Sequence, residues 1–366
     1  MDIMLSTVPC DYPFTSMTIG PGGDCWFCCP EWIANREKAC LGNVLTSSIK
    51  EVWNSSTALA IRRAMYDNDI DQWCRKKGCP VRHANAVFEL DSLSTQRRGE
   101  LFDESTVARI RQGTPTLEGF PSYLNLGHDY RCNLKCIMCA SPLYTKQYGN
   151  HGLSVDQLTE KIFAEITANI QWVRRIYFSV FGDPFASKRL LMFMQRDLRG
   201  ASHVELEVLT NGLLLTPKMW KSIAHNRFRA IRVSVDGARR ETYEKIRLGG
   251  RWKTLMHNLT HLGEVRRTDS IESFEITMTV MKLNYREMYE FFDLGMKLGC
   301  DCVSYQYIMG DLGNQDFWRQ DIDWNIVGFV REFFNSETGR NPRCYVEYLR
   351  HIAEMTPPRA TAARGT

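Results

Sequence analysis

Three cysteines, Cys132, Cys136 and Cys139, lie within eight consecutive residues, directly after a run at 122–127 whose composition is typical of a β-strand. Three thiolates on one short loop can each bind one iron of a [4Fe–4S] cube, which leaves the fourth iron without a protein ligand. A small molecule can bind such an open iron and be reduced there. The loop therefore predicts an iron–sulfur centre around which the rest of the chain is organised.

Two simpler explanations of these cysteines fit the sequence less well. A structural zinc site needs a fourth Cys or His at similar spacing, and none follows Cys139 within reach. Accidental packing of core cysteines does not account for three of them in eight residues beside the polar Asn133 and Lys135. The iron–sulfur interpretation is therefore favoured.

Length and composition bound the other possibilities. A chain of 366 residues is long enough for two domains, and 44% hydrophobic with 24% charged residues is typical of a globular protein. The net charge of +4 is too small to indicate a nucleic-acid partner. No apolar run reaches the ~18 residues of a membrane span, and the first residues lack the basic and apolar regions of a signal peptide.

The thirteen cysteines are unevenly distributed: seven precede residue 80, three form the loop, and Cys300, Cys302 and Cys344 come later. Without an export signal, this number indicates metal or redox chemistry in a reducing compartment, the cytoplasm, and not a disulfide framework. The uneven distribution predicts two separate metal sites.

After residue 154 the sequence alternates between helical and strand patterns, which predicts βα units around a parallel sheet. Ser154 is a candidate N-cap for a helix over 155–166. Strands are expected at 175–180, 204–209, 230–235, 274–281 and 302–308, and the run before the cysteine loop makes six. Catalytic groups in such folds lie where the carboxyl ends of the strands meet.

Several motifs at these strand ends carry a resemblance. The loop has the pattern CxxxCxxC, and residues 181–184, 210–212, 234–237 and 243–247 follow it with Gly182, Thr-Asn-Gly, Ser-Val-Asp-Gly and an Arg-bearing helix. In this order they resemble the radical S-adenosylmethionine (radical SAM) family, over residues 122–309. The resemblance implies an α/β fold, a partial (β/α)6 TIM-like barrel.

The resemblance also implies roles for individual residues. The backbone at Gly182 and Asp183 would receive the methionine ammonium of SAM, with Asp183 standing where the family has Glu. Ser234 would lie near the ribose, Arg247 would pair with the SAM carboxylate through its fork of donors, and Met138 would contact the adenine. Asn211 and Asp236 complete the implied cofactor-binding set, and Cys132, Cys136 and Cys139 the metal ligands.

A second resemblance lies in the first eighty residues. A cysteine, a Gly-containing turn, a Cys-rich hairpin and a closing cysteine pair are similar to the SPASM/Twitch auxiliary-cluster domain, which here precedes the barrel. It implies a second [4Fe–4S] cluster on Cys10, Cys28, Cys74 and Cys79. Cys29 remains an alternative to Cys28, and a zinc ribbon remains an alternative to the cluster.

The expected organisation has four parts. Residues 1–80 form the SPASM/Twitch-like domain, 81–120 a connector with a helix near 106–111, 121–310 the barrel, and 311–366 a carboxyl-terminal helical segment and tail. A forty-residue connector could span more than about 50 Å if extended, enough to bring the auxiliary module to the open side of the barrel. A helix is expected at 323–334, and a segment from Gly339 could cover the substrate opening.

The family resemblance implies an enzyme that cleaves SAM to a 5′-deoxyadenosyl radical, which abstracts hydrogen from a substrate. Its partners would be a small-molecule substrate and an electron donor of the flavodoxin or ferredoxin type. We expect an oxidoreductase or epimerase acting on a sugar, cyclitol or related biosynthetic intermediate, with Cys300 or Cys302 as a candidate hydrogen donor. A maturase modifying a peptide, and a non-catalytic iron–sulfur or zinc-binding protein, are the alternatives.

Overall fold

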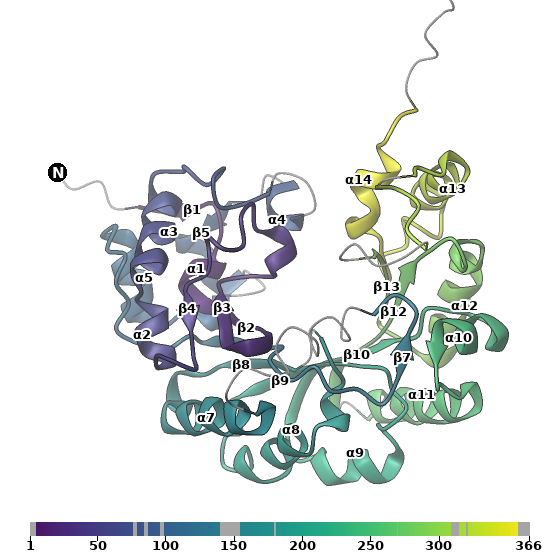
Figure 1. Ribbon diagram of the computed structural model, residues 1–366, viewed down its shortest axis with the longest axis horizontal. Helices are drawn as coiled ribbons and strands as arrows, with labels where there is room; N and C mark the ends of the chain where they lie inside the picture. The colour runs from purple at the N-terminus through teal and green to yellow at the C-terminus, as the bar shows by residue number, and fades with distance from the viewer. Residues whose placement is uncertain are drawn as a thin grey trace, which may run out of the picture.

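The computed structural model describes residues 5–75, 79–83, 87–95, 99–139, 154–178, 181–268, 270–308, 315–319 and 321–357. Their central element is a ten-stranded sheet in the order β14-β13-β12-β10-β9-β8-β6-β2-β3-β4 (Figure 1). Six neighbouring strands in its middle are parallel and correspond to the six expected from the sequence. Their bounds are β6 Tyr123–Leu126, β8 Arg175–Phe178, β9 Glu205–Thr210, β10 Arg227–Ser234, β12 Ile271–Val280 and β13 Cys302–Tyr307.

Helices cover one side of this sheet, as βα units require (Figure 1). They are α7 Val155–Ala168, α8 Lys188–Met192, α9 Pro217–Ile223, α10 Arg240–Ile246, α11 Trp252–Arg266, α12 Met288–Leu298 and α13 Trp324–Asn335. The predicted cap of α7 is confirmed, because Ser154 and Gln157 form a reciprocal capping box. None of the described helices is long and apolar enough to cross a membrane.

Alternation along the strands gives the sheet two different faces. Phe178 on β8 and Phe228 on β10 face the helices, where their rings contact Phe193 and Trp220. The opposite, concave face is polar and carries an ion-pair network of arginines and glutamates. Its members on the strands are Arg175, Glu205, Glu207, Arg229, Arg232 and Glu275.

The amino-terminal module continues this sheet. It contains α1 Tyr12–Thr15, β2 Ser16–Ile19, β3 Asp24–Trp26, β4 Gly42–Asn43, α2 Ile49–Trp53 and α3 Ser56–Tyr66. Strand β2 pairs in parallel with β6, Met17 opposite Leu124, and β3 and β4 extend the sheet antiparallel. Helices α2 and α3 are separate, because Asn54 is the C-cap of α2 and Ser55 is the N-cap of α3, where its hydroxyl accepts a hydrogen bond from the Ala58 N–H.

The connector is folded and not extended. It contains α4 Pro80–His83, β5 Phe88–Glu89, which pairs with β1 Thr7–Val8, and α5 Glu104–Arg111, which confirms the expected helix. The Ser122 hydroxyl donates a hydrogen bond of 2.6 Å to the Leu101 carbonyl oxygen. The module therefore reaches the barrel by strand pairing, and the long span that the connector could provide is not needed.

The carboxyl-terminal segment joins the opposite edge of the sheet. Helix α13 matches the predicted helix, and β14 Cys344–Tyr345 pairs in parallel with β13. A short turn, η9 Glu347–Leu349, and α14 Arg350–Ala353 follow. Figure 1 shows this yellow segment and the purple amino-terminal module at the two opposite ends of the sheet.

Candidate active site

The cysteine loop is anchored by a small second sheet. Strand β7, Lys135–Cys136, pairs antiparallel with β11, Arg247–Leu248, and Cys136 is opposite Arg247. The Ile137 N–H extends this pairing with a hydrogen bond of 3.0 Å to the Ile246 carbonyl. Arg247, which is distant in sequence, is thereby held against the middle cysteine of the loop.

The three thiols of the loop lie close enough to influence one another electrostatically, since Cys139 raises the pKa of both Cys132 and Cys136. Hydrogen-bond donors approach two of them. The Leu134 N–H and the Asn211 Nδ2 lie 3.4 and 3.6 Å from Cys132 Sγ, and Arg247 Nη1 lies 3.5 Å from Cys136 Sγ. Burial raises the pKa of Cys136 to about 11, an effect that the Arg247 charge opposes. Three facing thiols with donors to their sulfurs fit a cubane cluster with one free iron.

A buried ion pair supports Arg247. Its Nη2 lies 2.5 Å from Oδ2 of Asp236, whose side chain is fully buried. Asp236 has a left-handed backbone (φ 65°), and its Oδ1 accepts a hydrogen bond of 2.7 Å from the Thr279 N–H. Asp236 thus acts on the loop through Arg247. The Arg247 Nε is buried and has no hydrogen-bond partner among the described residues.

Asp183 joins the ends of two strands. Its buried carboxylate accepts hydrogen bonds from the Thr210 hydroxyl (2.8 Å), the Asn211 N–H (2.8 Å) and the Phe185 N–H (3.0 Å). Burial raises the pKa of this carboxyl, and the hydrogen bonds oppose the rise. Asp183 therefore positions Asn211 beside Cys132.

Gly182 allows the close backbone approach expected of it. A Cβ at this position would lie 2.5 Å from the Asp129 carbonyl oxygen and 2.7 Å from that of Arg131. The next residue, Asp183, donates its N–H to the Arg131 carbonyl oxygen at 2.9 Å. The segment after β8 is therefore packed directly against the start of the cysteine loop.

The remaining predicted contacts lie around the same edge. Ser234 ends β10 on the concave face, with its Oγ 3.4 Å from that of Thr277. Met138 packs against a small buried cluster of Ile246, Met281 and Ile308. Ser234 thus lies on the polar side of the edge and Met138 on an apolar one, as a ribose and an adenine contact would require.

Three residues before the first cysteine are structurally important and were not predicted. Arg131 Nε donates to Asp129 Oδ1 at 2.9 Å, and Arg131 Nη1 pairs with Asp156 of α7 at 2.9 Å. His128 is fully buried, with Nε2 3.1 Å from the Thr159 hydroxyl, and burial lowers its pKa to about 4. The sequence offered one signal that could have identified them, which is the position of Asp129 and Arg131 directly before the cysteine loop.

The structure does not bring Cys300 and Cys302 to this site. Cys302 is the first residue of β13, whereas the loop lies at the carboxyl ends of the strands, and six residues of strand span about 20 Å. Cys300 is fully buried next to Asp301, and burial raises its pKa strongly. Their expected role as hydrogen donors near SAM has no geometric support.

The auxiliary cysteines do come together. The Cys28 thiol lies close enough to Cys10, Cys74 and Cys79 for each to raise its pKa, after the larger effect of burial. Cys29 also raises the pKa of Cys28, and its own pKa, which burial raises to about 11, is raised further by Cys79. Among the described residues no set of three or more Cys, His, Asp or Glu is arranged for a single metal ion.

Aromatic side chains of the carboxyl-terminal part lie between the barrel and the auxiliary module. Tyr307 at the end of β13, Trp318 and His351 contact one another edge-on, with ring centroids 5.1, 4.9 and 4.7 Å apart. Glu31 and Cys29 of the module influence the pKa of Tyr307, which burial raises. These rings are in place to form a substrate wall.

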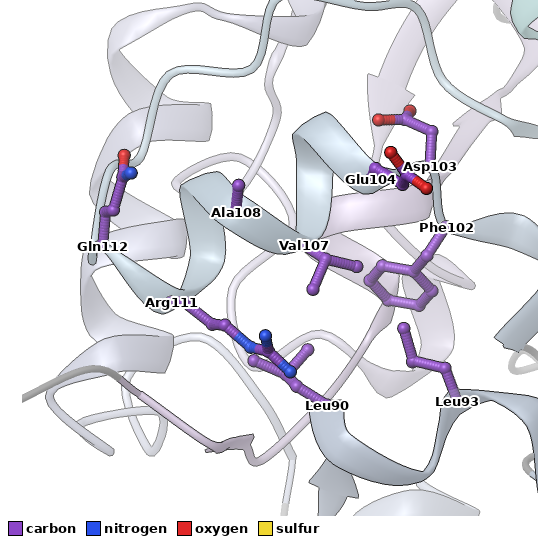
Figure 2. Close-up of a pocket in the computed structure, with 9 residues that line it drawn as sticks. All are labelled: Leu90, Leu93, Phe102, Asp103, Glu104, Val107, Ala108, Arg111 and Gln112. Atoms are coloured by element: carbon purple, nitrogen blue, oxygen red, sulfur yellow. The ribbon is translucent and has the colours of Figure 1, made fainter.

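A surface pocket lies elsewhere, in the connector. Leu90, Leu93, Phe102 and Val107 are among its lining residues, with Asp103, Glu104, Ala108, Arg111 and Gln112 (Figure 2). No cysteine lines it. It is therefore separate from both cysteine sites.

A parallel barrel with a three-thiol loop at the carboxyl ends of its strands defines an iron–sulfur enzyme that binds a ligand at an open iron. Residues 128–295 match the radical SAM superfamily, and residues 10–80 match the SPASM iron–sulfur cluster-binding domain. The chain therefore carries a radical SAM domain over residues 128–295 and a SPASM iron–sulfur domain on the amino-terminal side of the barrel. Its cofactors are SAM, a SAM-binding [4Fe–4S] cluster and an auxiliary [4Fe–4S] cluster.

Curated relatives match the chain over part of their length. The mycofactocin maturase MftC of Mycolicibacterium smegmatis is 25% identical over 170 residues, which are 46% of this chain and 40% of the relative. The AdoMet-dependent heme synthase of Methanosarcina barkeri is 28% identical over 168 residues, 46% of this chain and 45% of the relative. A GTP 3′,8-cyclase of Clostridium acetobutylicum is 24% identical over 124 residues, 34% and 37% of the two chains. This chain thus spans less than half of these relatives.

Among solved structures, Streptococcus suis SuiB bound to S-adenosylmethionine superimposes with a TM-score of 0.47 and 14% identity, covering 81% of this chain and 64% of that one. The anSMEcpe enzyme with bound AdoMet gives a TM-score of 0.43 and 16% identity, covering 62% and 64%. Both TM-scores are below 0.5.

Proposed function

We propose that this protein is a radical SAM oxidoreductase or epimerase that acts on a small polar metabolite, such as a sugar or cyclitol. The observation that carries the proposal is the polar concave face of the sheet. Arg232 on this face is held by Glu207 at 2.8 Å and by Glu275 at 2.9 Å. A polar surface of this kind suits a substrate that forms many hydrogen bonds better than it suits an apolar substrate.

Different residues of the chain would have different roles in such a reaction. Cys132, Cys136 and Cys139 would hold the cluster, and Asn211 and Arg247 orient its ligands by contacts to the sulfurs. When bound, SAM supplies the radical that removes hydrogen from the substrate, after an electron from a flavodoxin- or ferredoxin-type donor. The concave face would hold the substrate and exclude water.

The auxiliary site favours an oxidative outcome. Cys29, next to the predicted ligand Cys28, lies close enough to Tyr348 of the carboxyl-terminal segment to influence its pKa, which burial raises. This influence supports a place for the auxiliary cysteines on the side of the sheet where the carboxyl-terminal segment lies. A second redox centre there is in place to accept an electron from a substrate, which is the requirement for dehydrogenation.

The rival proposal is a maturase acting on a peptide. MftC is named a maturase, and SuiB has been solved with its precursor peptide SuiA, with a TM-score of 0.47 and 12% identity over 85% of this chain and 66% of that one. The similarity to MftC covers 46% of this chain. A peptide substrate therefore needs a direct test beside the small molecules.

The experiment is anaerobic reconstitution with SAM, a reductant and a panel of deuterium-labelled glycosides, cyclitols and peptides. We expect deuterium to appear in 5′-deoxyadenosine with a glycoside or cyclitol, together with loss of hydrogen or inversion at one carbon. Transfer from peptides alone would establish the maturase. Failure of a protein loaded with both clusters to produce 5′-deoxyadenosine would leave the non-catalytic alternative.

A further inference from the structure

We propose that Asn125, Tyr177 and Tyr348 form a subsite that recognises hydroxyl groups of a neutral, polyhydroxylated substrate. The three residues come from β6, β8 and the carboxyl-terminal turn η9, and no motif of the family includes them. The inference rests on the proposed function and narrows its substrate class. It concerns the concave face, below the cysteine loop.

The sheet register places the first two side chains together. Asn125 and Tyr177 are direct neighbours on the parallel strands β6 and β8, so both face the same side of the sheet. That side is the concave one, since the next residue, Phe178, faces the helices. The Arg232 guanidinium lies 5.8 Å from the centre of the Tyr177 ring, which places Tyr177 beside the ion-pair network.

Tyr348 reaches the same place from the other edge of the sheet. Turn η9 follows β14, which pairs with β13, and Tyr348 packs against the core. Its phenol lies close enough to Arg232 and Tyr177 for both to influence its pKa. Tyr348 therefore lies near Arg232, whose guanidinium is beside the Tyr177 ring.

These groups have hydrogen-bonding capacity that the protein does not use. Oδ1 of Asn125 is buried and has no hydrogen-bond partner among the described residues. Within the same part of the chain, the hydroxyls of Tyr177 and Tyr348 form no hydrogen bond either. Because a buried polar atom without a partner destabilises the folded protein, a site that keeps one is suited to a ligand that supplies the partner.

The charges around the subsite favour a neutral ligand. Arg232 is paired with Glu207 and Glu275, so its positive charge is already neutralised. Arg175 lies two residues before Tyr177 on β8, on the same face of the sheet. It is paired with Glu205 at 2.7 Å and with Glu100 at 2.5 Å. A phosphate or carboxylate would have to compete with these glutamates, whereas a hydroxyl group can bond an amide and two phenols without displacing any charge.

The test uses the anaerobically reconstituted holoenzyme with saturating SAM and three labelled probes: a neutral methyl glycoside, the matching uronate and the matching phosphate ester. Deuterium transfer into 5′-deoxyadenosine is measured for the wild type, Tyr177→Phe, Tyr348→Phe and Asn125→Ala. We expect transfer mainly from the neutral glycoside. Each phenylalanine variant should raise its KM about 10-fold, with little change in the 5′-deoxyadenosine formed without substrate.

Tyr289→Phe is the matched control, because this tyrosine packs between helices, against Phe329 and Phe333, and should leave the KM unchanged. Transfer from the charged probes alone would overturn the inference, and so would an unchanged KM in Tyr177→Phe and Tyr348→Phe. A loaded enzyme that produces no 5′-deoxyadenosine at all would instead overturn the proposed function.

Discussion

The two cysteine sites hold their thiols in different ways. In the loop of Cys132, Cys136 and Cys139, hydrogen-bond donors from other elements approach two of the sulfurs, and Cys132 is exposed. In the amino-terminal module, burial raises the pKa of Cys10 and Cys28 well above the ordinary value, and the neighbouring thiols raise it further. Burial raises the thiol pKa values at both sites, but at the loop Asn211 and Arg247 oppose that rise.

The largest effect is expected at the loop. Replacing Cys136 with Ala removes one of three ligands, so the SAM-binding cluster should be lost and 5′-deoxyadenosine formation should fall to background. Iron analysis should then give about four irons per chain in place of about eight. Cys40→Ala is the matched control, because Cys40 donates a hydrogen bond to the Gly42 carbonyl and belongs to neither predicted ligand set. Full SAM cleavage by Cys136→Ala would contradict the assignment.

Replacing Cys28, but not the adjacent Cys29, should remove the auxiliary cluster. All three other predicted ligands are among the main influences on the pKa of Cys28, whereas Cys79 is the one of these three among the main influences on that of Cys29. We therefore expect Cys28→Ala to reduce the iron content to about four per chain, while SAM cleavage without substrate continues. Cys29→Ala should retain about eight. The reverse result would make Cys29 the ligand, and eight irons in both variants would remove this pair from the site.

A smaller effect should follow from breaking the buried ion pair behind the loop. Asp236→Asn keeps the shape of the side chain and tolerates the left-handed backbone, but it leaves the Arg247 charge buried without its carboxylate. Loss of one partner of such a pair costs about 3–5 kcal/mol of unfolding free energy, measurable by anaerobic urea denaturation. The control is Glu290→Gln, which breaks an exposed pair with Arg239 and should change little.

The smallest effect is a pH dependence of the unfolding free energy that comes from a histidine beside the loop. The amino-terminal module has no such group, because the first histidine of the chain is His83. His128 stays neutral in the folded protein because burial lowers its pKa to about 4, whereas the unfolded chain binds the proton near pH 6.5. Its contribution is fully present above pH ~6.5 and falls by about 3 kcal/mol as the pH drops towards 4. His128→Gln should flatten this dependence of the urea midpoint, and His257→Gln, an exposed control, should not.

The parts of the molecule that sequence could predict are local in the chain. The cysteine loop, the six strands and the capped helix at Ser154 each depend on spacing or alternation over a few residues. The auxiliary set was accessible because its cysteines form a recognisable pattern with the turn at Gly23. Pairing of β2 with β6, across more than a hundred residues, left no such pattern.

Side-chain roles were harder to predict than positions. Arg247 and Asp183 lie at the predicted strand ends, but their charged groups bind Asp236 and the 210–211 backbone region, partners that a family motif does not specify. Tyr348 was not identified because its turn carries no motif and acquires its place through β14. The strand expected over 302–308 already placed Cys302 at its amino end, so the sequence itself argued against a hydrogen donor at the carboxyl ends of the strands.

The parallel pairing of β2 with β6 also determines how the chain can be divided. A fragment that starts at residue 121 would leave the backbone N–H and C=O groups of β6 without a neighbour on one side. Exposed strands of this kind recruit strands from other molecules, so the isolated barrel should self-associate. The first eighty residues therefore serve as a solubility element for the barrel, and expression of the domains should keep them on one polypeptide.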